Sequence, residues 1–159
     1  GFVVLGGSVS LNIASRNTGY AGFYVNGNGN VTNNAANYNQ EGFIVESGNV
    51  MGSLATYQNS SYGFILNNDS VAINISGDRN KNGIFVGFGA QLREGISACY
   101  DTEYGIFVNG GTVSGTFKSD KPIQGGGNWD GATIVPCQSG GGGGGGGGSP
   151  IMRKPSGLE

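Results

Sequence analysis

The chain has 159 residues, of which 34 are glycine and only 11% are charged, and its formal net charge is -2. It has no basic stripe of the kind that neutralises phosphates and no run of about 18 apolar residues, so we expect neither a nucleic-acid partner nor membrane insertion. Histidine is absent, which excludes Ser-His-Asp and Cys-His catalysis and removes the commonest ligand of transition metals.

A glycine followed by three apolar residues recurs every 20 to 22 residues from the N-terminus onward. A fixed period of this length, with a strand-like segment in each copy and Gly- and Asn-rich turns between copies, indicates a solenoid. The composition agrees, because turn formers are abundant and helix formers are scarce. The six copies are Gly1–Val4, Gly22–Val25, Gly42–Val45, Gly63–Leu66, Gly83–Val86 and Gly105–Val108.

Each repeat predicts two strands and a polar closing segment. Because side chains alternate along a strand, Phe43 and Val45 of the third repeat should point inward while Ile44 points outward. A Gly- and Asn-rich turn follows, and then a second alternating strand. In the first and fourth repeats, the residues expected to face inward from this second strand are Val9, Leu11, Ile13, Val71, Ile73 and Ile75.

One position of the closing segment holds an amide or an acid in five successive repeats: Asn17, Asn39, Asn59, Asn80 and Asp101. We interpret this column as a ladder of side-chain amides that satisfies buried turn carbonyls along the stack. The alternative is a sugar-binding strip formed with tyrosines, whose rings and hydroxyls suit glycans. The nearby tyrosines are Tyr20, Tyr38, Tyr57, Tyr62, Tyr100 and Tyr104, of which Tyr57, Tyr62, Tyr100 and Tyr104 are assigned to glycan binding.

The repeated G-[FI]-x-[VL] segment, its turn and the Asn-rich closure resemble the right-handed parallel β-helix repeat of pectate-lyase-like proteins and of phage tailspikes and tail fibres. The resemblance covers residues 1–124 and implies an all-β fold, a single-stranded right-handed parallel β-helix (solenoid) of about six coils with a glycine-rich C-terminal extension. It is specific for the fold and not for the activity, because this fold hosts lyases, hydrolases, adhesins and inert shafts.

The third position of each first strand forms an outward stripe of large apolar side chains. Exposed to water, such a stripe would approach several hundred Å², so we expect something to cover it. The resemblance to trimeric tail fibres implies three copies packed around a threefold axis. The alternatives are that the C-terminal segment folds back over the stripe or that the stripe is a ligand groove. The residues assigned to the oligomer interface are Tyr24, Ile44, Ile65, Phe85 and Phe107.

The composition changes after the last repeat. Residues 125–139 carry the one tryptophan and a further strand-like run, and we predict that they cap the open end of the solenoid or dock on it. Residues 140–159 begin with an uninterrupted glycine run and are interpreted as a linker and tail that ends in a cloning remnant. Cys99 and Cys137 either form one disulfide that clamps the cap onto the fifth coil or remain separate thiols.

Asp101 and Glu103 are the best candidates for a catalytic pair. Residues i and i+2 of an extended segment project from one face at roughly 6.5 to 7 Å, within the range of carboxylate separations that glycosidases use. The alternative is a solvated polar corner. A pectate-lyase-like reaction would need a calcium-binding acid cluster and a base placed for proton abstraction; neither is evident, so we expect no metal and no cofactor.

Together these features favour a structural and host-recognition module of a viral (phage) tail fibre or tailspike. Such a module would be homotrimeric, would lie in the virion tail, and would bind cell-surface polysaccharide without cleaving it. The first alternative is a carbohydrate-active enzyme, a polysaccharide hydrolase or lyase. The second is a bacterial adhesin that is secreted or held at the cell surface.

Overall fold

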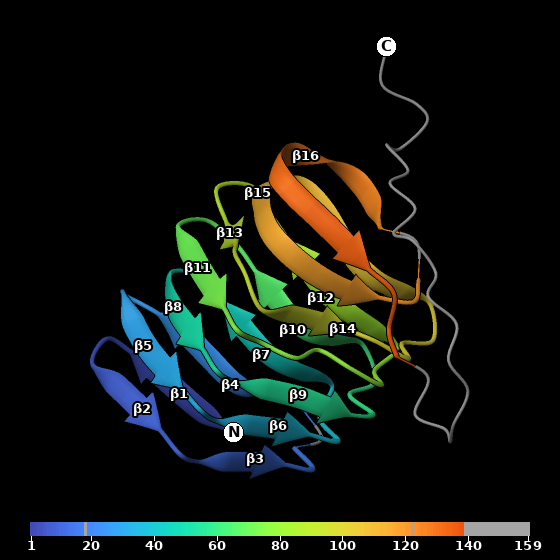
Figure 1. Cartoon of the computed structure of the whole chain (residues 1–159). Helices are drawn as coiled ribbons and strands as arrows, with labels where there is room; N and C mark the ends of the chain where they lie inside the picture. The colour runs from blue at the N-terminus through green and yellow to red at the C-terminus, as the bar shows by residue number, and fades with distance from the viewer. Residues whose placement is uncertain (18, 122, 139–159) are drawn as a thin grey trace.

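The computed structural model describes residues 1–17, 19–121 and 123–138, which form a parallel β-solenoid of about six coils without a helix. Successive coils stack along one axis, and the strands of each coil pair with those of the coils below and above it (Figure 1). This arrangement confirms the all-β parallel solenoid predicted from the repeat.

Each coil contributes to three walls, where the sequence predicted two strands and a closing segment. The first wall contains β1 (Phe2–Leu5), β4 (Ala21–Asn26), β7 (Glu41–Val45), β10 (Tyr62–Leu66), β12 (Asn82–Val86) and the start of β15 (Tyr104–Ser119). The second wall contains β2 (Ser8–Ser10), β5 (Gly29–Thr32), β8 (Gly48–Met51), β11 (Ser70–Ile73), β13 (Gln91–Leu92) and the middle of β15. The third wall contains β3 (Ile13–Ser15), β6 (Ala35–Asn37), β9 (Leu54–Tyr57), a bridging residue Ser76, β14 (Ile96–Ala98) and the end of β15.

The second corner, between the second and third walls, divides the strand that the sequence predicted as continuous. A residue with φ between 52° and 60° stands at this corner in each of the first four coils. A left-handed residue cannot continue a strand, so the chain turns and the inward alternation restarts. The predictions that Leu11 and Ile13 point inward are therefore wrong, since these residues are 80% and 71% exposed. The corner residues are Leu11, Asn33, Gly52 and Asn74.

In the fourth coil, the inward position of the second wall lies one residue later than the sequence predicted. Ala72, and not Val71, pairs with Val50 below and with Leu92 above. Ala72 is fully buried, whereas Val71 and Ile73, which were both predicted to face inward, are half-buried. The sequence pattern suggested Val71 because two apolar residues stand side by side and alternation alone does not choose between them.

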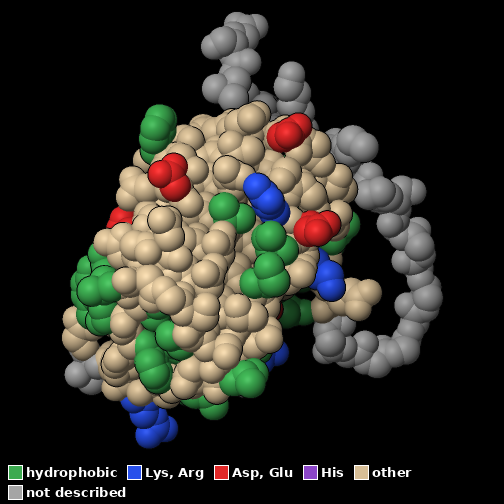
Figure 2. Space-filling view, turned by 90° about the vertical axis from the view of Figure 1, so that its left-hand side faces the viewer, with side chains coloured by type: hydrophobic (Ala, Val, Ile, Leu, Met, Phe, Trp, Pro, Cys, Tyr) green, Lys and Arg blue, Asp and Glu red, His purple; other side chains and the backbone are tan. Residues whose placement is uncertain are grey.

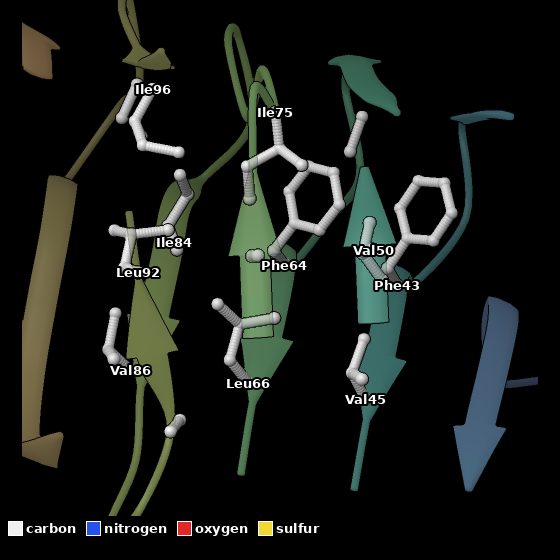
Figure 3. Close-up of a cluster of buried hydrophobic side chains, with 14 of the residues drawn as sticks. Phe43, Val45, Val50, Phe64, Leu66, Ile75, Ile84, Val86, Leu92 and Ile96 are labelled. Atoms are coloured by element: carbon white, nitrogen blue, oxygen red, sulfur yellow. The ribbon is translucent and has the colours of Figure 1, made fainter. Parts of the chain in front are cut away.

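The core is a narrow column of apolar side chains inside the walls. The rings of Phe2, Phe23, Phe43 and Phe64 stack with centroids 4.7 to 4.8 Å apart, the spacing of adjacent strands. Figure 3 shows Phe43 and Phe64 side by side, with Ile84 continuing the row in the next coil. The prediction that the second and fourth positions of the first strand point inward is confirmed.

The strand β16 (Gln124–Val135) covers the C-terminal end of the stack. It runs parallel to β15 along most of that strand, with Trp129 opposite Val113 and Ile134 opposite Phe117. Trp129 packs against the core, so this segment lies where a cap was predicted (Figure 1). The predicted linker and tail, residues 140–159, lies outside the described residues.

Candidate functional site

The third corner, between the third and first walls, contains the predicted amide ladder. Asn39 Oδ1 accepts hydrogen bonds from the backbone N–H and the amide of Asn17, at 3.0 and 2.8 Å. Asn80 Oδ1 accepts the equivalent pair from Asn59, at 3.1 and 2.9 Å. Each inner amide also donates to a backbone carbonyl of the core-facing column, which confirms the structural interpretation of the ladder. These acceptors are the carbonyls of Ala14 for Asn39, Ala36 for Asn59 and Ala55 for Asn80.

Asp101 is the last residue of this ladder. Its Oδ1 accepts the Asn80 N–H at 2.9 Å, and the residue is only 2% exposed. Glu103 lies outside, about half exposed, and forms an ion pair with Lys81 at 3.4 Å. One carboxyl group therefore faces the core and the other faces solvent, so the pair lacks the shared open cleft in which glycosidase carboxylates work. The expectation that both project from one face is not met, because the ladder turns Asp101 inward.

The electrostatic environment of Asp101 follows from its position. Burial raises the pKa of Asp101 to about 8, against the lowering effect of the Asn80 backbone hydrogen bond. Asp78 and Asp120 raise the pKa further, and Lys121 lowers it. A raised pKa is common in catalytic acids, but this carboxyl group has almost no exposed surface through which a substrate could reach it.

One side chain per coil projects from the third corner directly beside the ladder. Each of these residues precedes a ladder residue and has a positive φ, between 45° and 62°. Tyr38 and Tyr100 are each 45% exposed. The Arg16 guanidinium carbon lies 5.9 Å from the Tyr38 ring centre, and that of Arg79 lies 5.8 Å from the Tyr100 ring centre. We call this column the corner strip; it consists of Arg16, Tyr38, Gln58, Arg79 and Tyr100.

A shallow hollow of about 400 Å³ lies beside the corner strip in the lower coils. Amides and hydroxyls can both donate and accept hydrogen bonds, as sugar hydroxyls do, and a phenol ring adds apolar surface. The composition of the hollow therefore suits an uncharged polar ligand group such as a sugar. Its lining residues are Asn17, Tyr38, Asn39, Gln40, Gln58 and Ser60.

The four tyrosines assigned to glycan binding lie on different parts of the solenoid. Tyr62 and Tyr104 stand at the start of β10 and β15, each near a ring of the outward stripe. Tyr57 lies in β9 on the third wall, and its side chain is outside the described part of the structure. Of the four, Tyr100 belongs to the corner strip, so these residues do not form one common surface.

The outward stripe is a continuous column on the first wall, in register from Tyr24 to Phe107. Neighbouring side chains already cover much of it: Ile44 is only 6% exposed, and the other four assigned residues are partly buried. Phe85 stacks on Phe107 with centroids 5.8 Å apart. The segment 124–135 pairs with β15 at the end of the stack, so the alternative that it folds back over the stripe is wrong for this segment.

The surface carries few charges. Figure 2 shows a face formed mostly by backbone and uncharged polar side chains, with Lys, Arg, Asp and Glu scattered singly among separate apolar groups.

At the C-terminal end, Cys99 and Cys137 form a disulfide with their Cα atoms 5.9 Å apart. Of the two alternatives for these cysteines, the clamp onto the fifth coil is thus the one that the structure contains.

Within the described ranges, no group of three or more acidic or cysteine side chains is placed to bind a metal ion, and no helix is long and apolar enough to cross a membrane. Comparisons with family models, curated proteins and solved structures found no match to this chain. The fold is therefore assigned from its own strand pairing.

Sequence reasoning missed most of the corner strip. Tyr100 was assigned to glycan binding, but Arg16, Gln58 and Arg79 were not recognised as its neighbours in one column. The available signal was position and not residue type, because each member directly precedes a ladder residue. A search for a repeated residue overlooks a column in which arginine, tyrosine and glutamine alternate.

Proposed function

We propose that this chain is a structural and host-recognition module of a phage tail fibre or tailspike, located in the virion tail, that binds cell-surface polysaccharide without cleaving it. The corner strip is the observation that carries this proposal. Five successive coils each present one polar or aromatic side chain, spaced by about 4.8 Å, and in the lower coils the strip adjoins a hollow lined with amides. A repeating ligand can contact several coils of such a strip at once.

The lack of a usable carboxylate pair supports binding over cleavage. Asp101 is buried in the ladder and Glu103 is paired with Lys81, so neither is placed as the acid or the base of a hydrolase. A hydrolase or lyase would need catalytic groups other than this pair.

The outward stripe supports association between copies of the chain. Its partly buried aromatic and aliphatic side chains form one straight column along the first wall, which a second solenoid aligned side by side could cover. Burial of apolar surface contributes about 25 cal/mol per Å², so covering this column in a homotrimer would favour assembly. The placement in a virus rests on the resemblance of the repeat to tail fibres.

Binding to purified bacterial capsule and lipopolysaccharide tests the proposal. We expect the parent protein to bind at least one such polysaccharide while releasing no reducing ends or unsaturated uronates. Replacing Tyr38 and Tyr100 together with Ala should weaken binding about tenfold, because each aromatic contact contributes about 0.5 to 1.5 kcal/mol. Phe88→Ala is the matched control, since Phe88 is equally aromatic, 82% exposed and remote from the third corner.

The outcomes separate the alternatives. Equal loss of binding in the Phe88→Ala control would remove the corner strip as the site. Turnover that disappears in Glu103→Gln would overturn the non-cleaving proposal and favour the enzyme. A monomer that binds polysaccharide would favour a bacterial surface adhesin over a trimeric viral fibre.

A further inference from the structure

Asp101 occupies a position that asparagine holds in the four coils below it. Like the Oδ1 atoms of Asn39, Asn59 and Asn80, its Oδ1 accepts a backbone N–H from the preceding ladder residue. The second side-chain atom of each asparagine is an amide nitrogen, which donates. In Asp101 this atom is an oxygen, so the ladder places an acceptor where the pattern requires a donor.

The glycines of the first wall show that this oxygen lies in the place of the amide nitrogen. A Cβ atom on Gly63 would lie 2.6 Å from Asn80 Nδ2, and one on Gly83 would lie 2.5 Å from Asp101 Oδ2. Both glycines therefore leave room for the same ladder atom. The amides donate to the carbonyls of Ala14, Ala36 and Ala55, and the next residue of that column is Gly77, which follows the bridge between Leu54 and Ser76.

In the part of the chain that the structure describes, the surroundings of Asp101 Oδ2 provide no hydrogen-bond donor that would stabilise an ionised carboxylate. The atom is buried and has no hydrogen-bond donor among the described residues. The charged groups that act on it are Asp78, Asp120 and Lys121, two acids and one base. Asp78 accepts hydrogen bonds from the hydroxyls of Ser76 and Ser97, and Asp120 accepts one from the Tyr100 N–H, so these two acids have the donors that Asp101 Oδ2 lacks.

We propose that Asp101 is a neutral carboxylic acid in the folded protein, in which Oδ2 carries a proton and donates it to the Gly77 carbonyl, as the asparagine amides do in the coils below. The acid then completes the ladder. Loss of the proton places a carboxylate oxygen against a carbonyl oxygen and beside two acids, in a buried site. The fifth coil, which also holds Cys99, therefore becomes less stable as the pH rises.

The direction of the pH dependence follows from linkage. Burial raises the pKa of Asp101 from its ordinary value of 3.8 to about 8, so the folded chain keeps a proton that the unfolded chain loses. This stabilisation is fully present below the ordinary pKa, declines as the pH rises, and is lost once the pH passes about 8. Between these values the unfolding equilibrium constant should rise about tenfold per pH unit through this group alone.

Two measurements on the whole chain test the proposal. A carbon-13 NMR titration of the parent should give the Asp101 carboxyl carbon a midpoint near pH 8. In urea unfolding from pH 5 to pH 9, the unfolding equilibrium constant of Asp101→Asn should not rise tenfold per pH unit. At pH 9 this constant should be lower for Asp101→Asn than for the parent. Asp69→Asn is the control, because Asp69 is exposed and is not among the charged groups that act on Asp101, so that rise should stay in place.

A carboxyl midpoint near the ordinary value, or the same pH dependence of unfolding in Asp101→Asn and the parent, would overturn the proposal. If Asp101→Asn does not fold, the titration of the parent still decides, because it needs no variant. A midpoint near pH 8 supports the neutral acid in that case.

Discussion

The lower and upper coils of the solenoid fill the same core cross-section with different residues. In the second and third coils the first wall contributes a phenylalanine, and the second corner contributes a small polar side chain. In the fifth and sixth coils the first wall contributes an isoleucine, and the second corner contributes a large apolar one. The first-wall residues are Phe23, Phe43, Ile84 and Ile106, and their counterparts at the corner are Asn34, Ser53, Ile96 and Phe117.

The fourth coil, where the two patterns meet, has large residues at both positions. Phe64 lies on the first wall and Ile75 at the second corner, and both are buried. The second wall compensates with Ala72, which pairs with Val50 below and Leu92 above; Figure 3 labels these two larger neighbours. The comparison teaches that no single column fixes its residue, because a large side chain at one position can be matched by a smaller one at another, as close packing of the interior requires.

In the lower coils, the buried amide at the second corner has hydrogen-bond partners, as the ladder amides at the third corner do. Asn34 Oδ1 accepts the Asn12 N–H at 2.9 Å, and its amide donates to the carbonyls of Val9 and Thr32 at 3.0 and 2.9 Å. A buried amide is tolerated only when its partners are present. The second corner therefore accepts either a satisfied amide or an apolar side chain, and the first wall adjusts its size to match.

Phe43→Ala should give the largest effect and tests the lower half. It removes a ring that contacts two others, and the cavity should lower the free energy of unfolding by about 3 to 5 kcal/mol. Urea denaturation followed by circular dichroism measures this change. Ile84→Ala, at the equivalent position of the upper half, should cost less because a smaller side chain is lost. A Phe43→Ala protein with the parental denaturation midpoint would show that the ring column is wrongly placed.

Ala72→Val tests whether volume is balanced across the fourth coil. Alone, the added methyl groups should overpack the core and lower the free energy of unfolding by about 1 to 3 kcal/mol. In a Phe64→Leu background the same change should cost clearly less, because the smaller residue on the facing wall makes room. A double-mutant cycle by urea denaturation gives the coupling energy. Strictly additive effects would contradict compensation between the walls.

Replacing Ile65 and Phe85 together with Lys should have the smallest effect on folding. Both residues belong to the outward stripe and are only partly buried, so circular dichroism should show an intact solenoid. Light scattering should show that the oligomer dissociates, because the apolar column would be interrupted by charge. Phe88→Lys, outside the stripe, should leave assembly unchanged. A parent protein that is monomeric from the outset would end the trimer proposal.

The first wall could be predicted from the sequence because its signal repeats in residue type as well as in position. Phe43 and Phe64 recur with the coil, and strand alternation then assigns each neighbour to a face. The second corner could not be predicted, because Leu11 and Asn74 adopt a left-handed backbone conformation and no glycine marks these positions in the sequence. The inward position in the fourth coil was missed for a related reason, because Val71 and Ala72 are both apolar.

The candidate site divides in the same way. The amide ladder was predicted because four of its five members are asparagine. Its effect on Asp101 was not, because the i and i+2 rule assumes an extended strand, whereas the ladder draws Asp101 into the core. The corner strip was overlooked because its members, such as Arg16 and Tyr38, recur with the coil in position but are chemically unlike.

Because each coil stacks only on its neighbours, the length of this solenoid can change by whole coils. Excision of residues 41–61 would join Gln40 to Tyr62, so that Asn39 would meet Asn80 and the ring of Phe23 would meet that of Phe64. The shortened rod would lose about 4.8 Å and keep every column in register. Excision of half a coil would instead place each ladder residue against a wall, so a large deletion keeps the columns in register only when it removes complete repeats.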